Sequence, residues 1–216
     1  MPKFRIFPTG KFAAVRILAC VGILFYFVAL PHILASQYEP REGDILFQSL
    51  PRTSDLVKAI EGVTESKYSH CGVVIRKDGQ WLVNEALGTV RSTPLRAWIR
   101  RGRGYSADTF RLKKQHREHI PAFLQALEKY QGLPYDSRYR LDDDYIYCSE
   151  LVYKAWKDAP GQEMGSLDKL GDMNWKPYEA TIRKYEGGEP PLDRLMITPI
   201  GLSKAPQLER VQSTGL

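Results

Sequence analysis

The chain has 216 residues, of which 31 are Lys or Arg and 25 are Asp or Glu, and its formal net charge is +6. Four basic residues and no acidic residue lie in positions 1–36, so the rest of the chain, with 27 basic and 25 acidic residues, is almost neutral. Together with the lack of a recognisable binding motif, this near-neutrality excludes a broad nucleic-acid-binding surface. A cluster of four arginines is expected to be a solvated helix end and loop, with contact to anionic lipid heads or an acidic polymer as the alternative: Arg96, Arg100, Arg101 and Arg103.

The N-terminal segment predicts export. Positions 2–16 carry only basic charges, and Ile17–Leu30 is an uninterrupted apolar run, which is typical of a secretory signal. Extended to about 12–35, the run reaches the roughly 20 residues that a membrane-spanning helix needs. We expect residues 1–36 to be an uncleaved signal anchor, because the positions before Ser36 lack one of the small residues of a cleavage site; a cleaved signal peptide is the alternative. In both cases the rest of the chain is exported.

The segment 37–216 is long enough for one compact domain with its own core. Hydrophobic periodicity and turn residues predict its elements in chain order: a strand near 43–48, a helix over 56–65, a hairpin of strands over 71–75 and 81–87, a short helix over 95–101, a strand over 109–112, a helix over 120–131 and a helix from about 149. Only short elements are expected beyond Lys157. A lid over the cleft, formed by the tail 161–216 with Gly187-Gly188 as its pivot, is a hypothesis from the composition of that segment. Helices around an antiparallel sheet predict an α+β fold.

Cys148 lies where a loop is expected to pass into an amphipathic helix. Apolar residues fall on one face of that helix at helical spacing: Leu151, Val152, Ala155 and Trp156. A helix N-terminus offers unpaired N–H groups and the positive end of the dipole, which favour a thiolate and stabilise an oxyanion. A reactive cysteine also needs a base, and His70, just before a strand-like run, is the candidate.

The predicted exported domain contains two cysteines, Cys71 and Cys148. Exported proteins often carry paired cysteines, so a disulfide between them is the alternative to a free nucleophile. Cys71 directly follows His70 on a predicted strand, and successive side chains of a strand point to opposite faces. If His70 faces Cys148, Cys71 is therefore expected to face away from it, and Cys148 is expected to be free.

Four short motifs resemble the circularly permuted papain-like amidases and peptidases, which are relatives of the NlpC-type cell-wall peptidases and of lecithin:retinol acyltransferase. In chain order the motifs are Gly43–Phe47, Tyr68–His70, Asn84–Ala86 and Tyr147–Glu150, supported by Ser92–Leu95 and Gly132–Asp136. Each motif alone is weak, but their order and joint presence over 41–156 are fairly specific. The resemblance implies a permuted papain-like (NlpC-type) fold, in which an antiparallel sheet packs with helices and the histidine strand precedes the cysteine helix.

The resemblance also implies roles for four residues. Cys148 is the expected nucleophile, and His70 is the expected base that takes the thiol proton and later protonates the leaving group. Glu85 is expected to hold the second imidazole nitrogen and fix the tautomer. Tyr135, the matching tyrosine before the cysteine, is the expected oxyanion partner beside the Cys148 N–H.

No cofactor or metal is expected. His116 and His119 lie three residues apart without a further ligand nearby, which makes a zinc site improbable. The acidic run 142–144 lacks the glycine and distal glutamate of a calcium loop and is expected to be solvated.

The sequence therefore predicts an exported, membrane-anchored cysteine hydrolase on the periplasmic or cell-surface side. It is expected to cleave amide bonds of cell-wall peptide stems or short peptides through an acyl-thioenzyme. One alternative uses the same cysteine, histidine and glutamate as a lipid acyltransferase or thioesterase. The other is a catalytically silent module that binds a peptide or cell-wall fragment.

Overall fold

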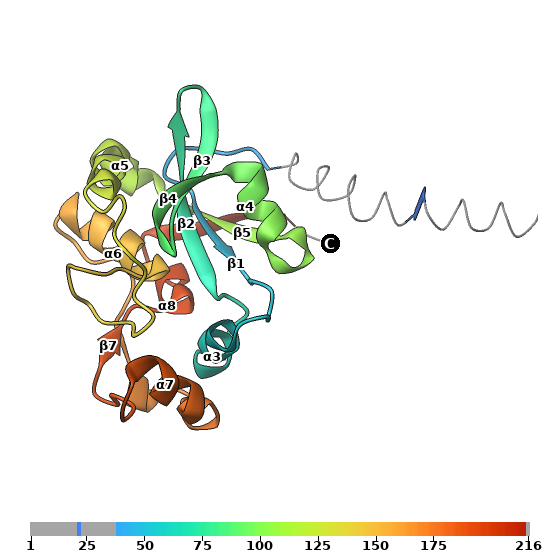
Figure 1. The fold of residues 1–216 in the computed structure, drawn as a ribbon. Coiled ribbons are helices and arrows are strands. Elements are labelled where there is room, and N and C mark those ends of the chain that lie inside the picture. Colours follow the sequence, from blue (N-terminus) through green and yellow to red (C-terminus); the bar gives the residue numbers. More distant parts are fainter. Residues whose placement is uncertain (1–20, 23–37, 215–216) are drawn as a thin grey trace, which may run out of the picture.

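The computed structural model describes residues 21–22 and 38–214 (Figure 1). Six of its strands are β1 (Ile45–Gln48), β2 (His70–Lys77), β3 (Gln80–Leu87), β4 (Thr89–Pro94), β5 (Ala107–Leu112) and β8 (Leu208–Thr214). They form one antiparallel sheet in the order β4-β3-β2-β1-β5-β8. Two further strands, β6 (Asp168–Lys169) and β7 (Leu195–Met196), pair separately.

Helices lie on both faces of the sheet and beyond its end (Figure 1). They are α3 (Asp55–Val63), α4 (Leu95–Arg101), α5 (Ile120–Glu128), α6 (Cys148–Asp158), α7 (Glu179–Glu186) and α8 (Pro199–Ser203). Short 3₁₀ turns span Arg103–Tyr105, Lys114–His119, Leu170–Asp172 and Lys176–Tyr178. The predicted α+β class, with an antiparallel sheet packed with helices, is confirmed.

Side chains of β2 alternate between two apolar cores, as the pleat of a strand requires. Cys71, Val73 and Ile75 face the larger core, which contains the apolar side of α6 and α5. Val74 faces the smaller core beneath α4, which contains the fully buried Trp98. The sheet is therefore covered by an apolar core on each of its two faces.

The part of the chain beyond Lys157 is more structured than expected. The helix α7 and the strand β8 were not predicted, and β8 completes the sheet by pairing with β5. Ile197 and Leu202 are fully buried in the larger core. The interpretation of this segment as a lid on a Gly187-Gly188 pivot is therefore wrong, because the residues after the pivot are part of the core.

The predicted signal anchor over 1–36, with its membrane helix over about 12–35, lies outside the described residues apart from Val21 and Gly22. Within the described part of the chain, none of the helices has the length and apolar character needed to cross a membrane.

Candidate active site

Cys148 is the first residue of α6 and is fully buried. The preceding residue, Tyr147, is extended (φ −101°, ψ 170°), and its N–H donates to a carboxylate oxygen of Glu150 at 3.2 Å. That bond fixes the point where the helix begins. Burial raises the pKa of Glu150 to about 8, although Lys154 lies 3.0 Å away and opposes the shift. Glu150 therefore serves to shape the first turn that carries the thiol.

His70 is the first residue of β2, and its Nε2 lies 2.6 Å from Oε2 of Glu85 on β3. Glu85 is fully buried. It also accepts hydrogen bonds from Thr93 Oγ1 (2.6 Å), Trp98 Nε1 (2.8 Å) and the Arg101 guanidinium (Nη1, 3.0 Å). Burial opposes ionisation of this carboxyl, but the bonds from His70 and Arg101 outweigh it and hold its pKa well below the usual range. The carboxylate is thus ionised and fixed from several directions.

Two side chains act most strongly on the Cys148 thiol, the His70 ring and the Cys71 side chain. The bond with Cys71 lowers the pKa of Cys148 most; burial raises it, and the bond and charge of His70 lower it further, so the net shift is strongly downward. For His70, burial lowers the pKa, but the bonds with Cys148 and Glu85 raise it to about 9. A thiolate beside an imidazolium is therefore the favoured state at neutral pH.

Cys71 lies beside Cys148, so the expectation that it faces away is wrong. Strand alternation does point Cys71 to the face opposite His70, but that face is the one against which α6 packs. His70 still reaches Cys148 because it is the first residue of its strand. Both cysteines are free thiols.

The Tyr135 hydroxyl interacts electrostatically with the sulfur atoms of Cys148 and Cys71. Its hydroxyl is 3.0 Å from the hydroxyl of Tyr139, a residue that the sequence analysis did not single out. Burial raises the pKa of both tyrosines well above the usual value, so both hydroxyls keep their protons. Tyr139 has φ of 57°, a conformation that a bulky residue adopts rarely and that is often retained at functional sites.

One arginine of the predicted solvated cluster does not fit that description: Arg101 is partly buried and pairs with Glu85. Arg103 is exposed as expected, although it also pairs with the buried Glu61 at 3.2 Å. Arg96 and Arg100 are exposed, as expected. The sequence does not reveal these partners, because Glu85 and Glu61 are brought next to the arginines only by the tertiary fold.

Within the described residues no group of three or more His, Cys, Asp or Glu side chains is arranged to hold a metal ion. His119 and His116 instead lie edge-on to the Trp156 ring, with centroid distances of 5.8 and 6.2 Å.

Comparison with known proteins points to one family. Residues 39–212 match the family model described as "Permuted papain-like amidase enzyme, YaeF/YiiX, C92 family". The uncharacterized protein YiiX of Escherichia coli K12 is 33% identical over 192 residues, which cover 88% of this chain and 93% of that protein. The crystal structure of YiiX from Escherichia coli O157:H7, which is described as a metalloprotein, superposes with a TM-score of 0.75 at 33% identity and covers 81% of this chain and 98% of that one.

The match spans both the strand with His70 and the helix with Cys148, in the permuted order that the sequence motifs indicate. The chain belongs to the YaeF/YiiX (C92) family of permuted papain-like amidases, and it is therefore a hydrolase of the cysteine peptidase type.

Proposed function

We propose that Cys148 is the nucleophile of an amide hydrolase, with His70 as general base and acid and Glu85 as the residue that orients the imidazole. One observation carries this assignment: the thiol at the N-terminus of α6 interacts with a histidine whose Nε2 is 2.6 Å from a buried carboxylate. This order of groups is the one a thiol nucleophile needs. Because all three side chains are present and in contact, a silent binding module is disfavoured.

The reaction runs in two balanced steps. The Cys148 thiolate attacks the carbonyl carbon, a C–S bond forms, and the C–N bond breaks as protonated His70 gives its proton to the leaving amine. The negative oxygen that forms on the way is stabilised by the helix N-terminus and by the Tyr135 hydroxyl. Neutral His70 then takes a proton from water, whose oxygen attacks the thioester carbon. The C–S bond breaks, the carboxylic acid is released, and the Cys148 thiolate and His70 imidazolium are restored.

The test is the pH dependence of Cys148 alkylation by iodoacetamide in the full chain, followed by mass spectrometry of the Cys148 peptide. Rapid alkylation is expected to persist well below the free-thiol pKa of about 8.5. His70→Ala is expected to slow it at neutral pH, because the imidazolium that stabilises the thiolate is lost. An ordinary thiol titration in the wild-type chain would refute the assignment.

We further propose that the domain works outside the cytoplasm, anchored by residues 1–36. The support is the sequence alone, in which a basic stretch precedes an apolar run. Expression in a Gram-negative bacterium tests it: the protein is expected in the membrane fraction, digestible by protease only after the outer membrane is opened. An intact mass lacking about 36 residues would indicate the cleaved signal peptide instead.

A further inference from the structure

Arg101, the last residue of α4, binds the same carboxylate as His70. Its Nη1 donates to Oε1 of Glu85 at 3.0 Å, and its Nη2 donates to Oε2, the oxygen that lies 2.6 Å from His70 Nε2. The guanidinium thus holds the carboxylate with two nitrogens, which is a strong and well-oriented form of ion pair. Because Oε2 serves both side chains, Arg101 and protonated His70 compete for one negative charge.

The ion pair is protected from solvent. The Arg101 side chain is 24% exposed, and Glu85 is fully buried. The guanidinium lies over the Trp98 ring, 6.0 Å from its centroid, and Trp98 Nε1 donates to Oε2 of Glu85 at 2.8 Å. Charges in such surroundings are screened much less than charges at the surface. The positive charge of Arg101 therefore acts on the imidazole through the carboxylate that they share.

Gly102 lets α4 end close to the sheet. A Cβ at this position would lie 2.5 Å from the Ser106 carbonyl oxygen and 2.7 Å from Gln48 Oε1, so a larger residue would push the end of the helix away. Gln48 is the cross-strand neighbour of His70. The local sequence thus fixes Arg101 beside the pair of strands that carries the histidine.

The groups around His70 and its carboxylate come from several elements. They are the Cys148 thiolate on α6, the Glu85 carboxylate on β3, the Arg101 guanidinium and the Trp98 ring on α4, the half-exposed Arg91 on β4, the Cys71 thiol on β2 and the Gln48 amide on β1. Two of these groups are anions, and both raise the pKa of His70. The buried cation of the set is Arg101.

The chain neighbours of Cys148 are neutral. The Ile197 N–H donates to the Tyr147 hydroxyl at 3.0 Å, and the Ile197 carbonyl accepts from Ser149 Oγ at 2.8 Å. These bonds hold the first turn of α6 from both sides of the thiol. Burial raises the pKa of Tyr147 well above its usual value, so its hydroxyl stays protonated.

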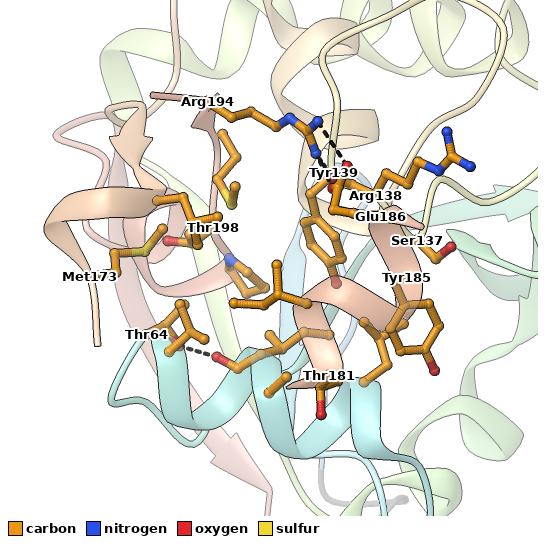
Figure 2. Close-up of a pocket in the computed structure, with 18 residues that line it drawn as sticks. Thr64, Ser137, Arg138, Tyr139, Met173, Thr181, Tyr185, Glu186, Arg194 and Thr198 are labelled. Atoms are coloured by element: carbon orange, nitrogen blue, oxygen red, sulfur yellow. Dashed lines mark hydrogen bonds and ion pairs between the residues drawn. The ribbon is translucent and has the colours of Figure 1, made fainter. Parts of the chain in front are cut away.

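Charged residues further along this side have partners of their own. Glu150, in the first turn of α6, lies 3.0 Å from Lys154. Figure 2 shows Tyr139 pointing into the pocket between α3 and α7, where Arg194 Nη2 donates to Oε2 of Glu186 at 3.1 Å. The charge balance at His70 is therefore decided by Cys148 and by the α4 face of the sheet.

Acylation changes that balance. Once Cys148 has become a thioester it carries no charge, and Glu85 is the anion that remains beside the imidazole. Hydrolysis of the thioester needs a neutral His70 that can take a proton from water. A carboxylate without a cation of its own would favour the protonated imidazole and would leave the enzyme trapped as the thioester. Arg101 supplies the compensating positive charge.

We propose that Arg101 is a positioning residue that enables the second step of the reaction. By sharing the Glu85 carboxylate, it keeps this group directed at the imidazole but limits how firmly it holds the imidazole proton. The inference rests on the proposed function. In the step concerned, His70 takes a proton from water, the water oxygen bonds to the acyl carbon, and the C–S bond breaks. The carboxylic acid leaves, and the thiolate and imidazolium are restored.

An activated ester isolates this step. The full chain is mixed with p-nitrophenyl acetate, whose good leaving group makes acylation fast and thioester hydrolysis limiting. The wild-type chain is expected to release a burst of about one p-nitrophenolate per Cys148, followed by a slower linear phase. The rate of the linear phase is expected to rise with pH as His70 loses its proton. Cys148→Ala gives the background to be subtracted.

Arg101→Gln removes the charge. It is expected to keep the burst and to slow the linear phase at neutral pH by about tenfold, with the difference closing at alkaline pH. Arg101→Lys keeps the charge and is expected to restore the pH dependence of the wild-type chain. The matched control is Arg91→Gln, because Arg91 Nε is 3.6 Å from Glu85 but its side chain is half exposed. This variant is expected to have the wild-type pH dependence.

Unfolding in urea checks that each variant is folded. Arg101→Met keeps an unbranched apolar side chain beside Trp98 and is the second neutral variant, with the same expected shift of the linear phase to higher pH. Arg101→Lys provides an independent test, because a shift to higher pH in this variant would contradict a role for the charge.

The outcomes separate the two proposals. A wild-type chain without a Cys148-dependent burst would overturn the proposed function. A burst in every variant, with the same pH dependence of the linear phase in the wild-type chain and in Arg101→Gln, would overturn the role of Arg101 alone. A loss of rate that is equal at every pH would also overturn it, because a merely structural residue would act in this way.

Discussion

The two faces of the sheet hold chemically different halves of the candidate site. On the α4 face, His70 and Glu85 lie in a network of charged and polar side chains that includes Thr93, Trp98 and Arg101. On the α6 face, Cys148 lies among Cys71 and neutral tyrosines at the border of the larger core. His70, the first residue of β2, connects the two halves because its ring interacts with both Glu85 and Cys148.

This difference indicates what sets each ionisation state. Glu85 has so many donors that the loss of one leaves its charge in place. The thiolate has few stabilising groups, chiefly His70 and Cys71, so the loss of either is expected to raise the pKa of Cys148. We therefore expect substitutions on the α4 face to act mainly on stability and the imidazole, and substitutions on the α6 face to act on the thiolate and the transition state.

The largest expected effect is on the α6 face. Cys148→Ala removes the nucleophile and is expected to lower kcat/KM by about 10⁴-fold or more, while the unfolding midpoint in urea changes little. The measurement uses an aminomethylcoumarin amide that the wild-type chain cleaves. Activity within about tenfold of wild type would mean that another group attacks the amide.

The second-largest effect is expected from a substitution in the polar network on the α4 face. Glu85→Ala leaves Arg101 and His70 without their buried partner and is expected to lower the free energy of unfolding by about 3–5 kcal/mol, measured in urea at neutral pH. The pKa of Glu85 is lower in the folded than in the unfolded chain, so the stabilisation is present at neutral pH and is lost as the pH falls through the folded value.

The matched control is Arg91→Ala. Arg91 Nε is 3.6 Å from Glu85 but its side chain is half exposed, so the expected loss is below about 1 kcal/mol. If both variants lose the same small amount, the buried network does not stabilise the fold.

A smaller effect is expected from the tyrosines of the α6 face. Tyr135→Phe removes one donor for the oxyanion and is expected to lower kcat by about 10²-fold with little change in KM. Tyr139→Phe acts through Tyr135 and is expected to cost about tenfold. Steady-state kinetics with a short acyl amide separates kcat from KM. An unchanged kcat in Tyr135→Phe would assign the oxyanion site to backbone groups alone.

The smallest effect is the most informative about the thiolate. Cys71→Ala removes the donor that lowers the pKa of Cys148 most, so this pKa is expected to rise. Iodoacetamide alkylation below neutral pH is then expected to slow by about tenfold at most. Cys71→Ser keeps a donor at the same position and is expected to slow less. Equal slowing in both variants would show that the volume of the sulfur matters, not its hydrogen bond.

The parts of the site that depend on local sequence patterns could be predicted from the sequence. The helix that starts at Cys148 follows from its apolar stripe, and His70, Glu85 and Tyr135 follow from motifs in a fixed order. The partners Trp98, Arg101 and Tyr139 were missed because their contacts are made only in the tertiary fold. The position of Cys71 was predicted wrongly. The alternation of side chains along a strand gives the face on which Cys71 lies, but it does not tell that α6 packs against that same face.

The fold of the tail was missed for a different reason. No residue of α7 is fully buried, so its sequence lacks the strong apolar stripe of a core helix. The strand β8 is at the edge of the sheet, where only one side is paired, and it carries a mixture of polar and apolar residues. Neither element has the pattern on which sequence-based prediction depends.

The bonds from Ile197 to Tyr147 and Ser149 bear on how the protein is made. A chain emerges from the ribosome or from a translocation channel with its N-terminus first, so His70 and Cys148 are exposed well before Ile197. Until Ile197 arrives, the first turn of α6 lacks its brace, and until β8 follows, the sheet lacks an edge. The nascent protein therefore carries its thiol in an unfinished setting, and hydrolysis should begin only when the chain is almost complete.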